Sequence, residues 1–404
     1  MSFNQYTWDL YKQTTIGIEM IKYFSDAGGY VLFKDYCPYA NFIPEDLYND
    51  WLENIYCYGV SDYDHPSSLE EAKDLYISLI TLGIRVEGQQ WLPANDFKNM
   101  LGIIQPMSYV LSQFAPEYFF PYLFLCRIFE LNKIADFFNI DLPNIPKRTD
   151  YKGRCMYYWE LCEVFYLFRK ENGLSPADLW SFLYDFAPNN LPSEKIDMPK
   201  PSQVWFIGGR LYQEDKSLES KFWQSSPETK KGDILVHYET SPISAITCIE
   251  TSLTDGVIDP LFRYYGCIYI GNRINIPHIT LKELQTDEYF FKHPLVRKNF
   301  QGVNGWSVNS ENYSELLRMI KTKGFDIEVL PKLYAPTLPK DVIIEYEHDV
   351  EQQLLEPLLN SMGWYENKDF IRQLPIQAGR GHRIFPDYAL HYGNKPNEER
   401  AKVL

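Results

Sequence analysis

The spacing of apolar residues changes its period near residue 200, and this change most constrains what the chain can fold into. Before it, apolar residues recur at helical intervals. A Ser-x-x-Glu capping box at Ser68 opens one such run, and Gly83 ends it. After it, short β-like runs bounded by glycine begin at Val204. The sequence therefore predicts an α+β multidomain protein.

Two proline-rich connectors divide the chain. The first runs from Ala187 to Gln203 and the second contains Pro331, Pro336 and Pro339. We expect an all-α domain over residues 1–190, with helices near 155–170 and 177–186. A β-rich domain over residues 200–325 should follow, closed by a helix near 313–321. A third α/β unit should begin at residue 341 and run to residue 404.

Composition narrows the class of protein. With 45% hydrophobic residues the chain can build real cores. The most apolar stretch, Tyr118–Phe129, is short and contains Pro121 and Arg127, so we expect a buried helix rather than a membrane span. No secretory signal opens the sequence, and the seven cysteines include no C-x-x-C pair. The pattern is typical of a reduced, cytoplasmic protein with no membrane partner and no zinc motif.

The net charge of −15 is unevenly distributed. Residues 1–199 hold 15 basic and 27 acidic side chains, residues 200–340 hold 17 and 16, and residues 341–404 hold 7 and 11. The middle part is therefore free to present a local basic face. Since few phosphates can be neutralised, any nucleic-acid binding should be salt-sensitive and depend on specific contacts.

The order of elements in the middle part is distinctive in combination. A strand at 203–207 comes first, and Gly232-Asp233 then turns directly into an apolar strand that ends at 237–241. An Ile-Thr-Leu-Lys-Glu-Leu segment at 279–284 precedes a closing helix that contains Tyr313. This order resembles the EVE branch of the PUA-like superfamily, which consists of small β-barrels that bind RNA or modified DNA bases.

That resemblance implies a pocket for a flipped base, which would be stacked on an aromatic ring and hydrogen-bonded along its edge. The segment 222–227 is polar and loop-like, so Trp223 is a better pocket candidate than Trp205, which we assign to the core. The residues that the resemblance places at the pocket are Trp223, Tyr238, Thr240, Ser241 and Ser225. Arg297, Lys298 and Asn299 are placed at the nucleic-acid backbone.

Two carboxylates in the C-terminal part occupy apolar positions. Glu351 shares a helix face with Leu355 and Leu358, and Asp387 follows Pro386 within an apolar strand at 384–390. An inward carboxylate is costly unless it has a partner such as a metal or a hydrogen-bond donor. Both therefore point to a site.

Several short motifs surround these acids: Pro357-Leu358-Leu359, Gly363-Trp364, Gly379-Arg380 and Asp387-Tyr388-Ala389-Leu390. Together with Glu351 they resemble the PD-(D/E)xK nuclease core at the N-terminus of type I restriction subunits. The resemblance implies that Asp387 ligates Mg²⁺ and that Glu351 is a supporting acid. Arg380 and Arg383 are assigned to the nucleic-acid backbone.

One departure from that family matters. The next strand of the nuclease core carries Glu-x-Lys, and here the printed sequence reads Ala401-Lys402-Val403-Leu404 before that motif. We therefore expect these residues by themselves to be a poor nuclease.

The leading hypothesis is a modification-dependent restriction endonuclease or a related antiphage protein. The middle part would read DNA with a modified base, the C-terminal part would cut it with Mg²⁺, and the helical part would bind partners or a second copy. One alternative is an RNA ligand with RNA-directed cleavage. Another is a non-enzymatic interaction protein that binds a basic partner through its acidic helical part.

Overall fold

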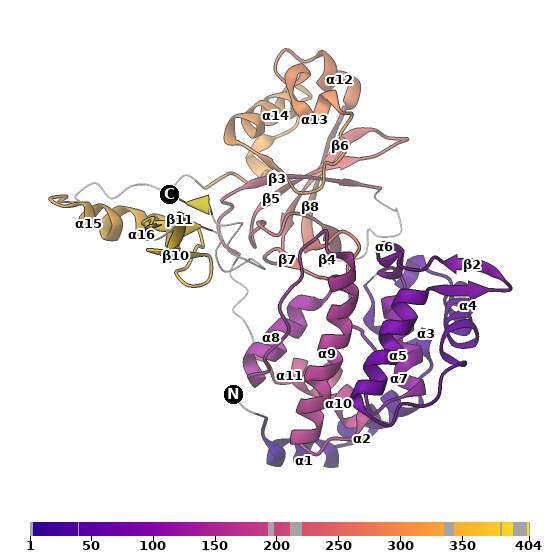
Figure 1. The fold of residues 1–404 in the computed structure, drawn as a ribbon. Coiled ribbons are helices and arrows are strands. Elements are labelled where there is room, and N and C mark those ends of the chain that lie inside the picture. The colour runs from indigo at the N-terminus through magenta and orange to yellow at the C-terminus, as the bar shows by residue number, and fades with distance from the viewer. Residues whose placement is uncertain are drawn as a thin grey trace. The chain divides into compact units, whose positions relative to one another are not determined.

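The computed structural model describes residues 3–38, 40–192, 198–210, 220–334, 343–379, 382–390 and 402–403. The chain forms two compact units of mixed α and β structure, drawn in Figure 1. Unit 1 comprises Met1–Lys195 together with the short segment Ile258–Tyr265. Unit 2 comprises Ile196–Val257 and Gly266–Leu404. None of the described helices combines the length and the apolar character that a membrane span requires.

Unit 1 is mainly helical. Its elements are α1 (Gln5–Gln13), α2 (Thr15–Asp26), α3 (Gly29–Tyr36), η1 (Ala40–Phe42), α4 (Glu45–Ile55), η2 (Tyr56–Val60), α5 (Leu69–Leu82), β1 (Ile84–Val86), β2 (Gln89–Leu92), α6 (Phe97–Met100), α7 (Ile104–Phe114), α8 (Ile128–Phe138), α9 (Tyr151–Glu171), α10 (Pro176–Ser181), η3 (Phe182–Phe186) and α11 (Ala187–Asn190).

Local signals set the ends of several helices. The Ser68 hydroxyl accepts a hydrogen bond from the Glu71 backbone N–H, and Gly83 ends α5 at φ 74°. Ser175 forms a reciprocal capping box with Asp178 at the start of α10. The helices predicted near 155–170 and 177–186 are present, although the second includes the π-helical turn η3. The expected connector at 187–203 begins instead with the short helix α11.

The prediction that residues 1–190 are all helical is wrong at one place. Strands β1 and β2 form an antiparallel hairpin in which Val86 faces Gln89 across a two-residue loop. Both loop residues, Glu87 and Gly88, have positive φ angles of 49° and 79°. Such a pair matches the twist of a tight hairpin, so local turn chemistry interrupts the helical run.

The expected helix over Tyr118–Phe129 is also wrong. Helix α8 begins only at Ile128, and the buried residues before it are irregular. Pro121 lacks a backbone N–H and disfavours helix at Phe120. Side chains satisfy the backbone instead. The Tyr158 hydroxyl donates to the Phe120 carbonyl at 2.7 Å, and the Ser108 hydroxyl accepts from the Tyr122 N–H at 2.8 Å.

The segment Ile258–Tyr265 belongs to unit 1 because its backbone is bound there. The buried guanidinium of Arg154 donates to the carbonyls of Pro260 at 2.8 Å and Phe262 at 2.7 Å. The carboxylate of Asp259 accepts from the backbone N–H of Cys126 at 2.8 Å and from that of Leu261 at 3.0 Å. Burial raises the pKa of Asp259 to about 6.

Unit 2 is built on a seven-stranded sheet. Its elements are β3 (Val204–Gly209), β4 (Ser220–Gln224), β5 (Ile234–Glu239), β6 (Ala245–Ser252), β7 (Val257–Ile258), β8 (Gly266–Thr280), α12 (Leu281–Thr286), η5 (Phe290–Lys292), α13 (Pro294–Arg297), β9 (Trp306–Val308), α14 (Ser310–Thr322) and η6 (Ile327–Val329). The strand order is β4-β8-β6-β5-β3-β9, with β7 beside β8. Strands β3 and β5 are parallel, and the other pairs on this path are antiparallel.

One face of this sheet is an apolar core covered by helices. Val204, Phe206, Val236 and Tyr238 point to this face, where α12, α13 and α14 contribute Leu284, Leu295, Leu316 and Ile320 among others. Figure 1 shows these three helices gathered beside the sheet. The closing helix predicted near 313–321 is therefore confirmed as α14. Its apolar residues recur three and four positions apart.

The sheet curls so strongly that its edge strand β4 meets residues of β5, three strands away in the sheet order. In a flat sheet β4 and β5 would lie about 14 Å apart, because each strand step is about 4.8 Å. The Trp223 ring on β4 lies 4.7 Å from the His237 ring on β5, measured between centroids. The second face of the sheet is therefore concave, and Trp205, Ile207, Leu235, Ile268 and Ile270 form a small apolar cluster there.

The C-terminal part of unit 2 is a small helix-and-strand module. Its elements are α15 (Glu347–Val350), η7 (Glu351–Leu355), α16 (Glu356–Ser361), β10 (Phe370–Arg372), β11 (Ile376–Gly379), β12 (His382–Ile384), β13 (Tyr388–Leu390) and β14 (Lys402–Val403). Strands β10, β13 and β14 form an antiparallel sheet in that order. Leu359 packs with Phe370 and Tyr388, so the helix lies against this sheet.

Candidate functional site

The concave face of the curled sheet holds a buried charged network. His237 on β5, Glu250 on β6 and Arg273 on β8 come from three adjacent strands. Oε2 of Glu250 lies 2.9 Å from Nδ1 of His237, and Oε1 accepts from Nε of Arg273 at 2.8 Å. His237 is 0% exposed and Glu250 2%. Such groups stay buried only when they satisfy one another.

The negative charge on Glu250 determines which ring nitrogen of His237 carries a hydrogen. Burial by itself would raise the pKa of Glu250, but the hydrogen bond from His237 and the charge of Arg273 hold it below its usual value. The ionised carboxylate therefore accepts a hydrogen bond from the Nδ1–H group of His237. The opposite nitrogen, Nε2, is buried and has no hydrogen-bond partner among the described residues.

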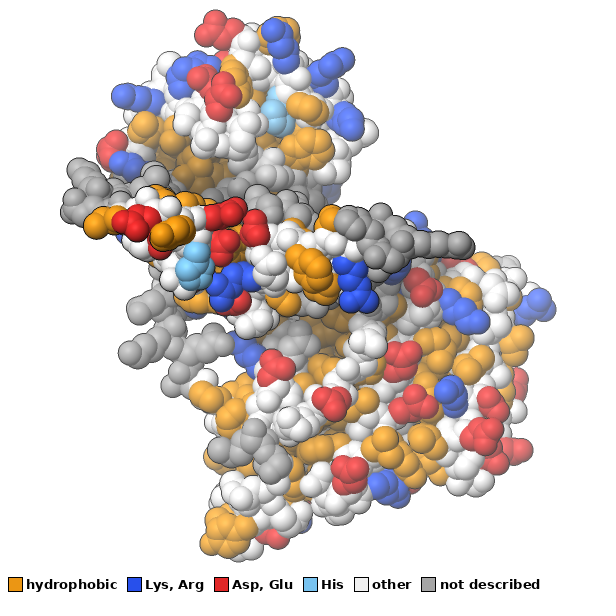
Figure 2. Space-filling view, turned by 60° about the vertical axis from the view of Figure 1, so that its left-hand side comes forward, with side chains coloured by type: hydrophobic (Ala, Val, Ile, Leu, Met, Phe, Trp, Pro, Cys, Tyr) orange, Lys and Arg blue, Asp and Glu red, His pale blue; other side chains and the backbone are white. Residues whose placement is uncertain are grey.

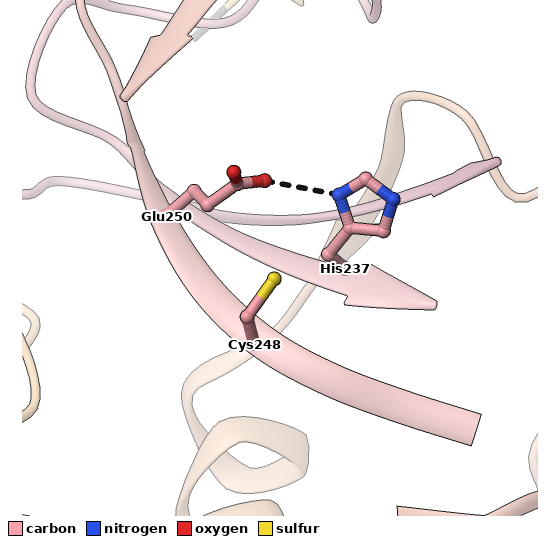
Figure 3. Close-up of side chains that lie close together, drawn as sticks. All are labelled: His237, Cys248 and Glu250. Atoms are coloured by element: carbon pink, nitrogen blue, oxygen red, sulfur yellow. Dashed lines mark hydrogen bonds and ion pairs between the residues drawn. The ribbon is translucent and has the colours of Figure 1, made fainter. Parts of the chain in front are cut away.

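Cys248 completes a cluster of three side chains on this face. It is the direct cross-strand partner of His237, and Glu250 follows it two residues later on the same side of β6. Figure 3 shows the Cys248 sulfur pointing toward the gap between the other two side chains. One nitrogen, sulfur or oxygen atom from each lies within 4.8 Å of the others. Burial raises the pKa of the Cys248 thiol to about 12, so it is protonated.

Trp223 and Asn304 adjoin this network. The Trp223 ring meets His237 edge to face, and its Nε1 donates to Oδ1 of Asn304 at 3.2 Å. The same Asn304 oxygen accepts from the Gly208 backbone N–H at 2.8 Å. Trp223 is only partly buried, so an aromatic ring and a buried imidazole share one face.

The sequence-predicted base pocket is not assembled as one group. Trp223 lies on strand β4 rather than in a loop, and it faces the concave side. Tyr238 faces the opposite, helix-covered side, where it stacks on Phe300 at 4.0 Å. The reason is strand parity: Tyr238 directly follows His237, and successive side chains point to opposite faces. Trp223 and Tyr238 therefore cannot hold one base between them.

Among the described residues, the hydrogen bonds of His237 and Glu250 do not involve the remaining predicted pocket residues. Ser225 is buried, and its hydroxyl is hydrogen-bonded to that of Thr229 at 3.0 Å. Thr240 and Ser241 follow the end of β5. The predicted backbone contacts Arg297, Lys298 and Asn299 are exposed at the end of α13.

The face drawn in Figure 2 carries no single large patch of one charge among the described residues. On the face drawn in Figure 2, acidic and basic side chains of the described residues are interspersed. Binding of nucleic acid on that face would therefore have to use local contacts, as the net charge already indicates.

The two predicted nuclease acids differ in environment. Asp387 is exposed immediately before β13, and its Oδ1 accepts from Nε2 of Gln373 at 2.9 Å. Glu351 is half-buried. Burial raises the pKa of Tyr388, and the negative charge of Glu351 raises it further. Arg383 on β12 is exposed, whereas Arg380 lies outside the described residues.

As a Mg²⁺ site this arrangement is partial. An exposed carboxylate suits a hard cation that prefers oxygen ligands. Among the described residues, however, neither Asp387 nor Glu351 belongs to a group of three clustered ligands. The residues present therefore fit one ligand of such a site rather than the whole of it.

His237, Glu250, Arg273 and Asn304 were not singled out from the sequence. A signal existed, because an ionisable residue interrupts each of the apolar runs Ile234–Glu239 and Ala245–Ser252. As with Asp387, an ionisable residue at an apolar strand position indicates a site on both strands. Their convergence depends on strand register, which the sequence does not display.

Comparisons with known proteins add no family. No protein-family model matches the chain, and no curated protein matches it. One similar solved structure is the NMR structure of Rpa0253 from Rhodopseudomonas palustris, 13% identical with a TM-score of 0.26, covering 30% of this chain and 94% of that one. Another is a hypothetical protein from Leishmania major, 11% identical with a TM-score of 0.25, covering 31% and 98%. At these scores neither likeness carries a conclusion about fold or function.

Proposed function

We propose that this protein binds nucleic acid carrying a modified base through the concave face of its curled sheet, and that its C-terminal module contributes to a Mg²⁺-dependent nuclease. The middle part would act as a PUA-like reader of the EVE type. The protein would then serve restriction of foreign DNA, with the helical unit as the surface for partners or a second copy.

The reader is supported by one observation above all. A partly buried tryptophan lies against a buried imidazole whose Nε2 has no hydrogen-bond partner among the described residues. Recognition of an extruded base needs these two elements, a stacking ring and an unsatisfied polar atom for the base edge. Trp223 and His237 would supply them, with the Asn304 amide as a further polar group. Tyr238 is not part of this proposal.

The nuclease is supported by the register of the C-terminal sheet. Ala389 pairs with Val403 and Leu390 with Lys402. If this antiparallel register continued by two more pairs, the residue opposite Asp387 would be the second one after Val403. A Glu-x-Lys beginning there would put its acid beside Asp387 on one face of the sheet. Asp387 would hold the Mg²⁺, which neutralises charge at a scissile phosphate.

Gel-shift titrations test the reader. Matched duplexes carrying 5-methylcytosine, 5-hydroxymethylcytosine, 6-methyladenine or no modification, together with single-stranded RNA, are compared at several salt concentrations. We expect one modified duplex to bind more tightly than the plain duplex. Loss of the Trp223 ring in Trp223→Ala should weaken that preferred complex by about 1–3 kcal/mol.

Phe222→Ala is the matched control, because Phe222 lies next along β4 and makes its ring contact with Tyr269 instead of His237. It should retain the preference. Equal affinity for all duplexes in the unchanged protein would refute the reader proposal. Tighter binding of single-stranded RNA than of any duplex would indicate that the ligand is RNA rather than DNA.

Cleavage is tested on the protein as it is encoded, in Mg²⁺ and with the preferred duplex. Asp387→Asn should abolish cleavage and leave duplex binding unchanged, since Asp387 and Trp223 lie in different parts of the fold. Gln373→Ala, which removes the neighbouring amide, is the control that should retain activity. Undiminished cleavage by Asp387→Asn would refute the nuclease assignment.

A further inference from the structure

The cluster of His237, Cys248 and Glu250 presents three different metal-binding atoms in one buried place. Cross-strand pairing sets His237 beside Cys248, and strand periodicity sets Glu250 on the same face. The three are 0%, 0% and 2% exposed. Because sheet register sets the positions of all three side chains, the cluster is a fixed part of the curled sheet.

We infer that His237, Cys248 and Glu250 form a binding site for a borderline divalent cation such as Zn²⁺. The ligand atoms lie within 4.8 Å of one another, and the closest pair is 2.9 Å apart. Tetrahedral zinc sites, with bonds of about 2.0–2.3 Å, separate their ligands by roughly 3.3–3.8 Å. Small side-chain rotations therefore bring the cluster to coordination geometry.

The types of ligand select the cation. A thiolate and an imidazole favour Zn²⁺ or a similar transition metal over Mg²⁺ or Ca²⁺, which prefer oxygen. Arg273 holds the other oxygen of Glu250, Oε1, and so orients Oε2 toward the site. Three protein ligands leave one tetrahedral position for water or another small ligand.

The protons displaced by metal binding can be counted from the metal-free state of the cluster. Metal binding forms a sulfur–metal bond and breaks the S–H bond of Cys248, which releases one proton to solvent. The proton on Nδ1 of His237 moves to Nε2 and is not released.

Co²⁺ titration of the whole chain tests the site. The expected result is one equivalent bound, with a thiolate-to-Co²⁺ charge-transfer absorption that Zn²⁺ abolishes. Cys248→Ser should lose this absorption and at least about tenfold in affinity, because changing even an outer-shell partner typically costs 10- to 100-fold. His237→Gln is a second variant that retains the thiol and should weaken binding similarly.

Cys267→Ser is the matched control, since Cys267 is also buried in the same sheet and its sulfur contacts the Val257 carbonyl. It should bind Co²⁺ as the unchanged protein does. Absence of the charge-transfer absorption in the unchanged protein, or its persistence in Cys248→Ser, would overturn the inference. These readouts need no nucleic acid and therefore stand or fall separately from the proposed function.

Discussion

Replacing Tyr184 by phenylalanine removes one oxygen atom that supports an irregular buried segment. The Tyr184 hydroxyl donates to the Pro121 carbonyl at 2.5 Å and accepts from the Leu123 N–H at 3.2 Å. Both backbone groups lie in the stretch that replaces the expected helix, so no helical partner compensates them. Each unsatisfied buried group costs about 1–3 kcal/mol. Since two groups lose their partner, we expect Tyr184→Phe to destabilise unit 1 by about 2–6 kcal/mol.

Tyr122 offers the same chemical change with the opposite expectation. Its ring is 0% exposed, and its hydroxyl is buried with no hydrogen-bond partner among the described residues. Removing that hydroxyl sacrifices no bond and relieves a desolvated polar group. Tyr122→Phe should therefore be neutral or stabilising by up to about 1 kcal/mol.

Urea denaturation followed by far-ultraviolet circular dichroism measures both variants. The shift in midpoint, multiplied by a common m value, gives the change in free energy of unfolding. Hydrogen exchange of residues 118–127 then reports whether the loss is local to the segment that Tyr184 supports. Equal shifts of the midpoint in the two variants, in either direction, would refute the supporting role of the Tyr184 hydroxyl in this segment.

Three further predictions concern stability and the concave face. Burial raises the pKa of Asp259 to about 6, above the unfolded value of about 3.9, so its stabilising contribution is present below pH 4 and lost as pH rises through 6. In the unchanged protein the free energy of unfolding should therefore fall by about 1–3 kcal/mol between pH 4 and pH 7. Asp259→Asn should flatten this decline. Arg154→Met leaves several buried carbonyls without a donor and should destabilise by about 3 kcal/mol or more in urea, whereas the exposed Lys152→Met should stay within about 0.5 kcal/mol. Gly209→Ala would put a Cβ 2.5 Å from Cζ2 of Trp223, so it should change Trp223 fluorescence and weaken binding of the preferred duplex while far-ultraviolet circular dichroism stays unchanged.

Much of the local structure was predictable because it depends on neighbours in the sequence. The cap at Ser68, the stop at Gly83 and the apolar period of α14 involve residues a few positions apart, and all three appear as expected. The strands beginning at Val204 and Ile234 were predicted for the same reason. The hairpin at Glu87-Gly88 was missed although its turn signal is also local.

The site depended on contacts between residues far apart in the sequence. Nothing near His237 indicates that Glu250 and Arg273 lie beside it, because their meeting follows from the register of three strands. The same holds for Trp223, which reaches β5 only because the sheet curls. The nuclease acids remain predictions from resemblance, since the structure leaves Asp387 exposed beside Gln373.

By itself the sequence determined several ends of helices and strands, such as the cap at Ser68 and the strand start at Val204, and that an acidic helical part precedes a strand-rich part. Local backbone preferences and side-chain period suffice for that. Only the tertiary structure decided which side of the sheet each residue faces, separating Tyr238 from Trp223 and joining His237 to Cys248 and Glu250. One residue of register reverses the face of every side chain on a strand, and register is set by the packing of the whole sheet.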